Sequence, residues 1–274
     1  MVTCLSNLAE QGYDAFVLKT VSEGPGLSIL EAAEAVGIPT INNSRAIRLV
    51  RDKAVATAFA RVNGLPIPPT YFVAHPRLLK QIGPEAYPLV VKPSNGSSCK
   101  GIYLLNSPAD LAALEIAEAK ESFFLAQRYA ENAGFDIKLY VTGQEVYAIA
   151  KKSPLHPNIE EGLVPVTSEM RRIALQAGRL FGLDIFGVDV VETGSGLAVL
   201  DINDFPSFGL VPRAVARVSE YILHAAARAE LQRTARAARR ERRRQRERRR
   251  EMSPAESRPT ANADGAEYAI KRIS

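Results

Sequence analysis

The segment "VLDINDFPSF" (residues 199–208) places oxygen-bearing side chains on a strand that is otherwise apolar. Asp201 and Asn203 are two residues apart, and side chains with that spacing point to the same face of a strand. An earlier apolar segment, "IFGVDVVE" (185–192), carries Asp189. Carboxylate and amide oxygens are hard ligands that suit Mg²⁺ or Mn²⁺, so these residues indicate a divalent-metal site.

A hairpin would bring these residues together. The chain between the two segments predicts a β-hairpin whose turn is the three residues 194–196. In that register Thr193 lies opposite Leu197, and Asp189 lies directly opposite Asp201. Two facing carboxylates repel each other in a sheet, and a bound cation removes that penalty.

The same residues also allow a purely structural interpretation. Asp201 and Asn203 would then only begin a loop, with Asn203 and Asp204 as turn residues before Pro206. A slip of the register by one residue would also separate the two carboxylates.

A second candidate lies in "LVVKPSNGSSCKG" (residues 89–101), where Lys92 ends an apolar strand and a Gly/Ser loop follows. Backbone N–H groups of such a loop can bind phosphate, and a nearby lysine adds a point charge. The loop is not a P-loop, because Ile102 follows Gly101 where a Lys-Ser/Thr pair is required. Alternatively, the segment is a surface hairpin.

Further basic residues lie on two neighbouring predicted strands. Lys138 belongs to "FDIKLYV", and Lys151 and Lys152 belong to "YAIAKKS". Basic side chains beside a metal site suit an anionic ligand, although a solvated sheet face would have the same pattern. His156 follows in a loop, where it either contacts an acceptor or is simply a loop histidine.

The elements that position these residues follow from periodicity and from turn signals. Residues 13–43 predict strand, helix and strand, and one helix is expected over 44–64 and another over 167–182. Residues 65–74 predict an extended connection, and 107–120 a helix. Predicted strands and hairpins cover the remaining apolar segments, namely 87–105, 122–130, 136–143, 145–153 (with Gly143-Gln144 as the turn) and 185–203. A last helix follows Pro212.

The composition is that of a globular protein, since 46% of the 274 residues are hydrophobic and 24% are charged. No run of about 18 apolar residues occurs, so we expect no membrane span. The first residues lack the basic start and apolar core of a signal peptide, and Cys4 and Cys99 form no disulfide framework. These features predict a cytoplasmic protein.

Positive charge is concentrated near the C-terminus. Residues 228–251 contain 12 Arg and 4 Glu, whereas the whole chain carries a net charge of only +5, so the remainder is mildly acidic. The segment is helix-forming but has no aromatic residue for base stacking, so we expect at most a weak, salt-sensitive contact with RNA or another polyanion. Alternatively, it is a solvated appendage, followed by a disordered stretch at 252–267.

Four segments, in this order, resemble the ATP-grasp superfamily, and the resemblance covers residues 13–215. They are "INNSRAIRLVRDKAVATAFARVNGLPIPPTYF", "YPLVVKPSNGSSCKGIYLL", "FFLAQRYAENAGFDIKLYVTGQEVYAIAKK" and "LFGLDIFGVDVVETGSGLAVLDINDFPSF". The chain looks most similar to RimK-like glutamate (amino-acid) ligases and to the inositol polyphosphate kinases of this fold. The resemblance implies an α+β fold in which two lobes clamp ATP.

The resemblance also implies a domain organisation. Residues 1–44 would be part of an N-terminal α/β domain, of which we expect only about the second half. Residues 45–224 would form the ATP-grasp domain, and 225–274 a basic, helical and then disordered tail.

The resemblance further assigns roles to residues that match family motifs. Lysines and a Gly/Ser loop would bind the ATP phosphates, namely Lys53, Lys92, Gly96, Ser97 and Ser98. Gln127, Arg128, Tyr129 and Ala130 would form the adenine hinge, and Asp136 would lie near the ribose. Lys138 and Lys151 would be catalytic, and Asp189, Asp201 and Asn203 would bind Mg²⁺ or Mn²⁺.

The two neighbouring families differ in the acceptor of the phosphoryl group. A ligase phosphorylates a carboxylate and an amine then displaces phosphate, whereas a kinase stops after transfer to a hydroxyl. "SRAIRLVRDK", "GLPIPP" and "AENAGFDIK" resemble the ligases, although those usually have Glu at Asp201 and Arg at Lys138. "DINDFP", "IKLYVTG", "KKSPLHPN" and Lys19 resemble the kinases.

We favour a ligase acting on a small-molecule or peptide acceptor, because kinases for polyphosphates need a strongly basic pocket and the folded part is acidic. A nucleotide-binding protein without turnover is the further alternative.

Overall fold

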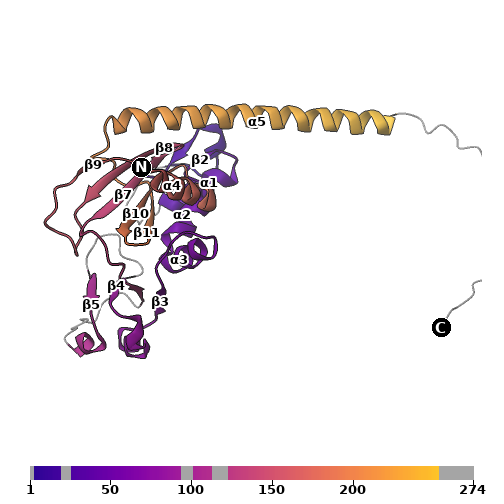
Figure 1. Ribbon diagram of the computed structural model, residues 1–274. Helices are drawn as coiled ribbons and strands as arrows, with labels where there is room; N and C mark the ends of the chain where they lie inside the picture. The colour runs from indigo at the N-terminus through magenta and orange to yellow at the C-terminus, as the bar shows by residue number, and fades with distance from the viewer. Residues whose placement is uncertain (1–2, 20–25, 94–100, 113–122, 253–274) are drawn as a thin grey trace, which may run out of the picture. The chain divides into compact units, whose positions relative to one another are not determined.

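The structure is a computed structural model that describes residues 3–19, 26–93, 101–112 and 123–252. The chain divides into two compact units, Met1–Ala229 and Glu230–Ser274. The first unit combines helices with two antiparallel sheets and one short parallel sheet (Figure 1), so the predicted α+β class is confirmed.

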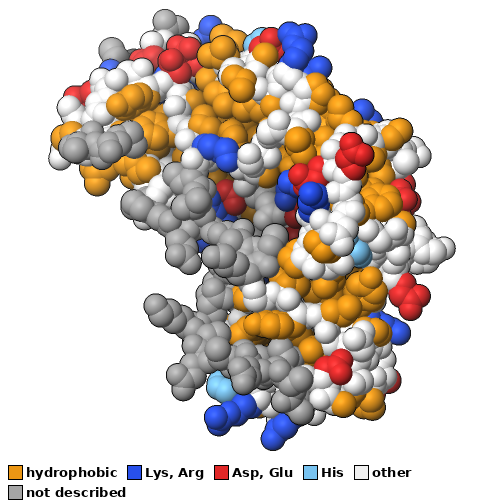
Figure 2. All heavy atoms as spheres, turned by 90° about the vertical axis from the view of Figure 1, so that its left-hand side faces the viewer, with side chains coloured by type: hydrophobic (Ala, Val, Ile, Leu, Met, Phe, Trp, Pro, Cys, Tyr) orange, Lys and Arg blue, Asp and Glu red, His pale blue; other side chains and the backbone are white. Residues whose placement is uncertain are grey.

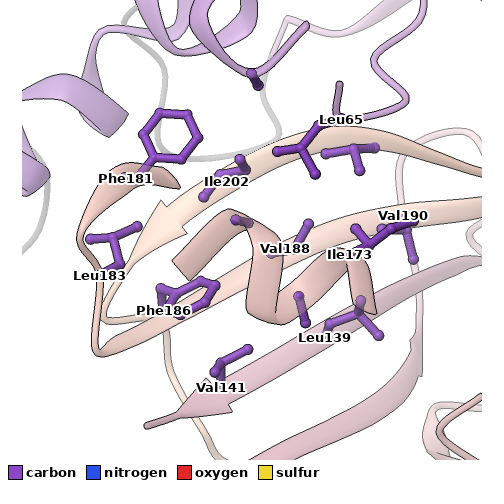
Figure 3. Close-up of a cluster of buried hydrophobic side chains, with 14 of the residues drawn as sticks. Leu65, Leu139, Val141, Ile173, Phe181, Leu183, Phe186, Val188, Val190 and Ile202 are labelled. Atoms are coloured by element: carbon purple, nitrogen blue, oxygen red, sulfur yellow. The ribbon is translucent and has the colours of Figure 1, made fainter. Parts of the chain in front are cut away.

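The larger sheet has the strand order β11-β10-β7-β8-β9, and every neighbouring pair is antiparallel. Side chains alternate between the two faces of each strand, so one face is apolar and packs against a helix. In Figure 3, Leu139 and Val190 of this sheet lie beside Ile173 of that helix, α4. The elements are β7 (Asp136–Thr142), β8 (Glu145–Lys151), β9 (Gly162–Val164), α4 (Ser168–Phe181), β10 (Ile185–Thr193) and β11 (Gly196–Asp204).

The smaller sheet has the order β3-β6-β4-β5 and is also antiparallel. Its strands are β3 (Thr70–Val73), β4 (Leu89–Pro93), β5 (Tyr103–Leu105) and β6 (Phe124–Arg128), accompanied by the 3₁₀ helices η2 (Pro76–Gln81), η3 (Pro84–Ala86) and η4 (Pro108–Ala112). Part of the predicted extended connection therefore pairs as β3. The helix predicted over 107–120 contains η4, and its residues 113–122 lie outside the described ones.

The N-terminal residues form a small layer of their own. It consists of η1 (Leu8–Glu10), β1 (Phe16–Val17), α1 (Gly26–Ala35) and β2 (Thr40–Ile41), and the two strands pair in parallel. Asn42 is fully buried and joins this layer to β10, since its side chain donates to the Ile185 carbonyl at 2.7 Å and accepts from the Asp184 and Ile185 N–H groups. The predicted strand, helix and strand are confirmed.

The single helix predicted over 44–64 is wrong, because Asp52 divides it into α2 (Ser44–Arg51) and α3 (Lys53–Val62). Asp52 has an extended backbone (φ −78°, ψ 95°), and its side chain accepts from the Ala54 and Val55 N–H groups. An aspartate that caps a new helix ends the preceding one. Lys53 thereby becomes the first residue of α3.

The helix predicted after Pro212 is confirmed as α5 (Ala214–Met252). Within the first unit, its residues Val218, Tyr221 and Ile222 pack against Tyr140 and Ile149 of the larger sheet. Among the described residues, no helix is both long and apolar enough to cross a membrane. The predicted disordered stretch lies almost entirely in residues 253–274, outside the described part of the chain.

Candidate functional site

The hairpin of β10 and β11 aligns the predicted carboxylates. Thr193 pairs with Gly196, so the turn has two residues, and the predicted pairing of Thr193 with Leu197 is wrong. The register then shifts between Val190, which pairs with Val199, and Asp189, which pairs with Asp201. The shift is a β-bulge that leaves one extra residue on β11, and it restores the predicted pairing of Asp189 with Asp201.

Lys138 on β7 continues this row across the sheet. It pairs with Asp189 in the register, and its ammonium group lies 2.8 and 2.9 Å from the two carboxylate oxygens of Asp189. Asn203 donates from its amide to Asp189 Oδ2 at 2.9 Å. Asp189 is thus held from two neighbouring strands.

Asp201 has its own cationic partner. Lys53 Nζ lies 2.7 Å from Asp201 Oδ2, and the two side chains are only 18% and 22% exposed. Lys53 reaches this position because the capping residue Asp52 starts α3 there. The helix break that the sequence did not predict is therefore what presents Lys53 to the sheet.

Lys92 is the second-last residue of β4 in the smaller sheet, and its side chain reaches the larger sheet. Its ammonium group donates to the carbonyl of Leu200 at 2.9 Å. Leu200 is the extra residue of the bulge, and the carbonyl of such a residue is released from the regular ladder. The bulge therefore supplies the acceptor that holds Lys92.

Burial and neighbouring charges shift the pKa values of this cluster. Burial lowers the pKa of Lys92, with Lys53 adding to the effect and Asp201 opposing it. Burial acts to raise the pKa of Asp201, but Lys53 and Lys92 outweigh it and lower that pKa. Burial acts to lower the pKa of Lys138, but Asp189 outweighs it and raises that pKa. The lowered Asp201 and raised Lys138 values favour the charged forms of those groups.

The cluster lies in a cavity of about 340 Å³ that is lined by both sheets. Figure 2 shows basic and acidic side chains gathered in a hollow on one face of the molecule. The cavity brings together all the predicted site residues that the structure describes, namely Lys53, Lys92, Gln127, Arg128, Tyr129, Ala130, Asp136, Lys138, Lys151, Asp189, Asp201 and Asn203. The other three, Gly96, Ser97 and Ser98, lie outside the described residues.

The predicted hinge, residues 127–130, includes the end of β6 and the residues directly after it, and it lines one wall of the cavity. The N–H of Arg128 donates to the Pro69 carbonyl and that of Tyr129 to the Pro88 carbonyl, both at 2.8 Å. Within the described part of the chain, the next N–H, that of Ala130, donates to no protein group. It is available for a ligand in the cavity.

Two further pairs line the cavity that sequence reasoning did not predict. His156 Nδ1 lies 2.9 Å from Asp136 Oδ1, which joins the loop after β8 to the start of β7. Arg51 contacts both carboxylate oxygens of Asp204, at 3.0 and 2.8 Å. Asp204, earlier considered only as a turn residue, thus fixes the end of β11 next to Asn203.

Gly187 keeps space for Lys138. A Cβ atom at this position would lie 3.0 Å from Lys138 Cε and 3.0 Å from Pro206 Cγ. We expect Gly187→Ala to displace the ammonium group from Asp189 and to lower the turnover supported by this site by about 10- to 100-fold, measured as steady-state kcat. The matched control is Gly194→Ala in the turn of the same hairpin, where a Cβ meets nothing within 4 Å. Equal activities of the two variants would contradict this role.

Comparison with known proteins identifies the family and the fold. Residues 50–216 match the family described as RimK-like ATP-grasp domain. A probable alpha-L-glutamate ligase from Alkalilimnicola ehrlichii is 31% identical over 206 residues, which are 70% of this chain and 68% of that protein. A D-alanine–D-alanine ligase from Bacillus anthracis, complexed with ATP, is 17% identical with a TM-score of 0.62, over 84% of this chain and 85% of the other. The ATP-grasp ligase PsnB, complexed with a precursor peptide and AMPPNP, is 22% identical with a TM-score of 0.53, over 67% and 58%.

Proposed function

The chain belongs to the RimK-like ATP-grasp family and is an ATP-dependent carboxylate–amine ligase, and we propose that its cavity binds Mg²⁺-ATP and acts on glutamate or on a glutamate-containing peptide. The observation that carries the proposal is the cluster of three lysines, two aspartates and one asparagine in one cavity between two sheets. The named relative is a glutamate ligase, and a fold neighbour is bound to a peptide.

The nucleotide would lie along the wall that joins the two sheets. The free Ala130 N–H is suited to adenine, which carries ring nitrogens that accept hydrogen bonds. Lys53 and Lys92 would bind the phosphates, with the Gly96–Ser98 loop covering them, and Asp136 would lie near the ribose. Asp136 is already hydrogen-bonded to His156, so we propose that the two side chains orient the sugar together.

The donor set fits Mg²⁺. No cluster of three or more His, Cys, Asp or Glu side chains occurs among the described residues, so these offer no nitrogen- or sulfur-rich metal centre. Two carboxylates and one amide are few ligands, and Mg²⁺ prefers such sites because it takes its other oxygens from phosphates and water. We propose that Asp189, Asp201 and Asn203 hold the ion, which would neutralise charge on the β- and γ-phosphates.

The chain's own residues would then position the reacting groups. A carboxylate oxygen of the acceptor attacks the γ-phosphorus, which releases ADP and forms an acyl phosphate. An amine nitrogen next attacks the acyl carbon, phosphate leaves, and the amine loses a proton as the amide forms. Lys138 and Lys151 would stabilise the negative charge of the transferring phosphoryl group, and catalysis would rest mainly on position and electrostatics.

The kinase alternative receives no support from the comparisons. Lys138, Lys151, Lys152 and His156 do line the cavity, but Lys19 does not; its ammonium group donates to the Phe205 carbonyl at 3.1 Å. The matched family is described as a RimK-like ATP-grasp domain, and the named relative is a probable glutamate ligase. We further propose that residues 45–224 form the catalytic domain and that the protein acts in the cytoplasm.

The test measures ADP and free phosphate together with Mg²⁺-ATP and L-glutamate or glutamate-containing peptides. We expect equal amounts of ADP and phosphate, and both should depend on the amine and on the carboxylate. ADP formed without free phosphate, and only with an inositol phosphate, would identify a kinase and overturn the proposal. Glu192→Gln, which removes an exposed carboxylate from the same hairpin, should behave as the wild type.

A further inference from the structure

In the basic part of α5, arginines occur on several faces, and one sector carries arginines without glutamates. At 3.6 residues per turn, Arg239, Arg242 and Arg246 fall within a sector of about 60°. Glu241 lies on nearly the opposite side, where its carboxylate accepts from Gln245. With the adjacent Arg243 the sector widens to about 100°. We define the sector of Arg239, Arg242, Arg243 and Arg246 as the arginine stripe; all four side chains are exposed.

This part of the helix has no apolar surface to bury. Residues 239–248 contain only Arg, Glu and Gln, so the segment cannot pack into a protein core or insert into a bilayer. Every basic residue between 228 and 251 is arginine and none is lysine. A solubilising tail needs only charge, which lysine supplies equally well, whereas the planar fork of arginine binds phosphate oxygens in pairs.

The stripe is available to a ligand. Arg243 forms an ion pair with Glu247 at 2.8 Å, although it remains 82% exposed. Within the described part of the chain, Arg239, Arg242 and Arg246 form no ion pair or side-chain hydrogen bond. Arg239, Arg242 and Arg246 are three and four residues apart, so a cation recurs roughly every 4.5–6 Å along the axis, with Arg243 next to Arg242.

We propose that the arginine stripe binds the phosphate backbone of a nucleic acid, independently of the ligase reaction. Residues 228–252 contain no aromatic side chain, so the bases are not stacked or read, and binding is independent of sequence and strongly weakened by salt. RNA and DNA present the same phosphate chemistry, and the experiment distinguishes them.

The test compares two triple variants of the full chain that lose the same charge. Arg239, Arg242 and Arg246 are changed to Gln in the first. In the second the changed residues are Arg240, Arg244 and Arg248, which form another row on the side of the helix that carries Glu241. Fluorescence anisotropy measures binding to a labelled RNA duplex and a labelled DNA duplex over a series of salt concentrations. Circular dichroism confirms that both variants keep the helix, since Gln is a good helix former.

The stripe variant is expected to bind at least about tenfold more weakly than the second variant. The slope of its log binding constant against log salt concentration should be smaller than that of the wild type by about 2–3. Tighter binding of RNA or of DNA identifies the source of the phosphates, and either supports the proposal. Equal losses in the two variants would overturn it, because charge alone would then explain binding. Equally tight binding of poly-glutamate at matched charge would also overturn it, since the partner would then be an acidic polypeptide.

Discussion

Asp201→Asn is expected to lower Mg²⁺-dependent ATP turnover by about a thousand-fold or more. Asp201 contacts Lys53, and the charges of Lys53 and Lys92 lower its pKa, so it is a carboxylate at neutral pH. The amide keeps the shape but removes the negative charge that would hold the metal and that offsets Lys53. Steady-state kinetics at saturating ATP, with ADP release as the readout, measure the loss.

Two controls separate this effect from unfolding. Thermal unfolding shows whether Asp201→Asn leaves the fold intact, and Glu192→Gln removes an exposed carboxylate from the same hairpin. A folded Asp201→Asn protein that keeps more than about a tenth of the wild-type turnover would exclude a metal-binding role for Asp201.

The second large effect is a strong coupling between metal and nucleotide. Asp201 is paired with Lys53 and Asp189 with Lys138, at 2.7 and 2.8 Å. A divalent cation must therefore compete with two ammonium groups. Under the proposed function, the phosphates of a nucleotide would attract those ammonium groups and release the carboxylates. We expect Mn²⁺ to bind at least about tenfold more tightly with AMPPNP present, measured by electron paramagnetic resonance.

Lys138→Met tests this coupling because the substitution should strengthen the binding of the metal alone and weaken the binding of the nucleotide. Loss of the ammonium group leaves Asp189 without its cationic partner, so Mn²⁺ alone should bind several-fold more tightly than to the wild type. The nucleotide should bind more weakly, and the coupling should shrink. Isothermal titration of each ligand alone gives both values. Weaker binding of Mn²⁺ alone by the variant would show that Lys138 does not compete with the metal.

The pairing of Asp189 with Asp201 was predictable, but for a reason that the structure corrects. The sequence predicts a three-residue turn, whereas the turn has two residues and the bulge at Leu200 supplies the missing one. Either arrangement leaves one additional unpaired residue between Thr193 and Asp201, in the turn or in the bulge, so the predicted register at the carboxylates is correct. Side chains alternate between the two faces of β11, so Asp201 and Asn203 share one face. The other face of the strand must be apolar because it packs on α4.

The break between two helices, a short edge strand and a contact distant in sequence were not predictable. Helix periodicity continues through Asp52, and only the cap it forms shows that α3 starts there. Strand β9 has three residues and no strong pattern, so pairing with β8 alone identifies it. The contact of His156 with Asp136 joins residues 20 positions apart, and nothing local to either residue indicates the other.

The bulge also shows that β11 is one residue longer than the alignment of its acids requires. With the two-residue turn, a chain lacking Leu200 would still place Asp201 opposite Asp189 in an unbroken ladder. That shorter hairpin would lack the Leu200 carbonyl, so the buried ammonium group of Lys92 would lose its hydrogen-bond acceptor. The length of the hairpin is thus determined by a lysine on the other sheet, and a gap at this position in a related sequence would predict a change at Lys92 as well.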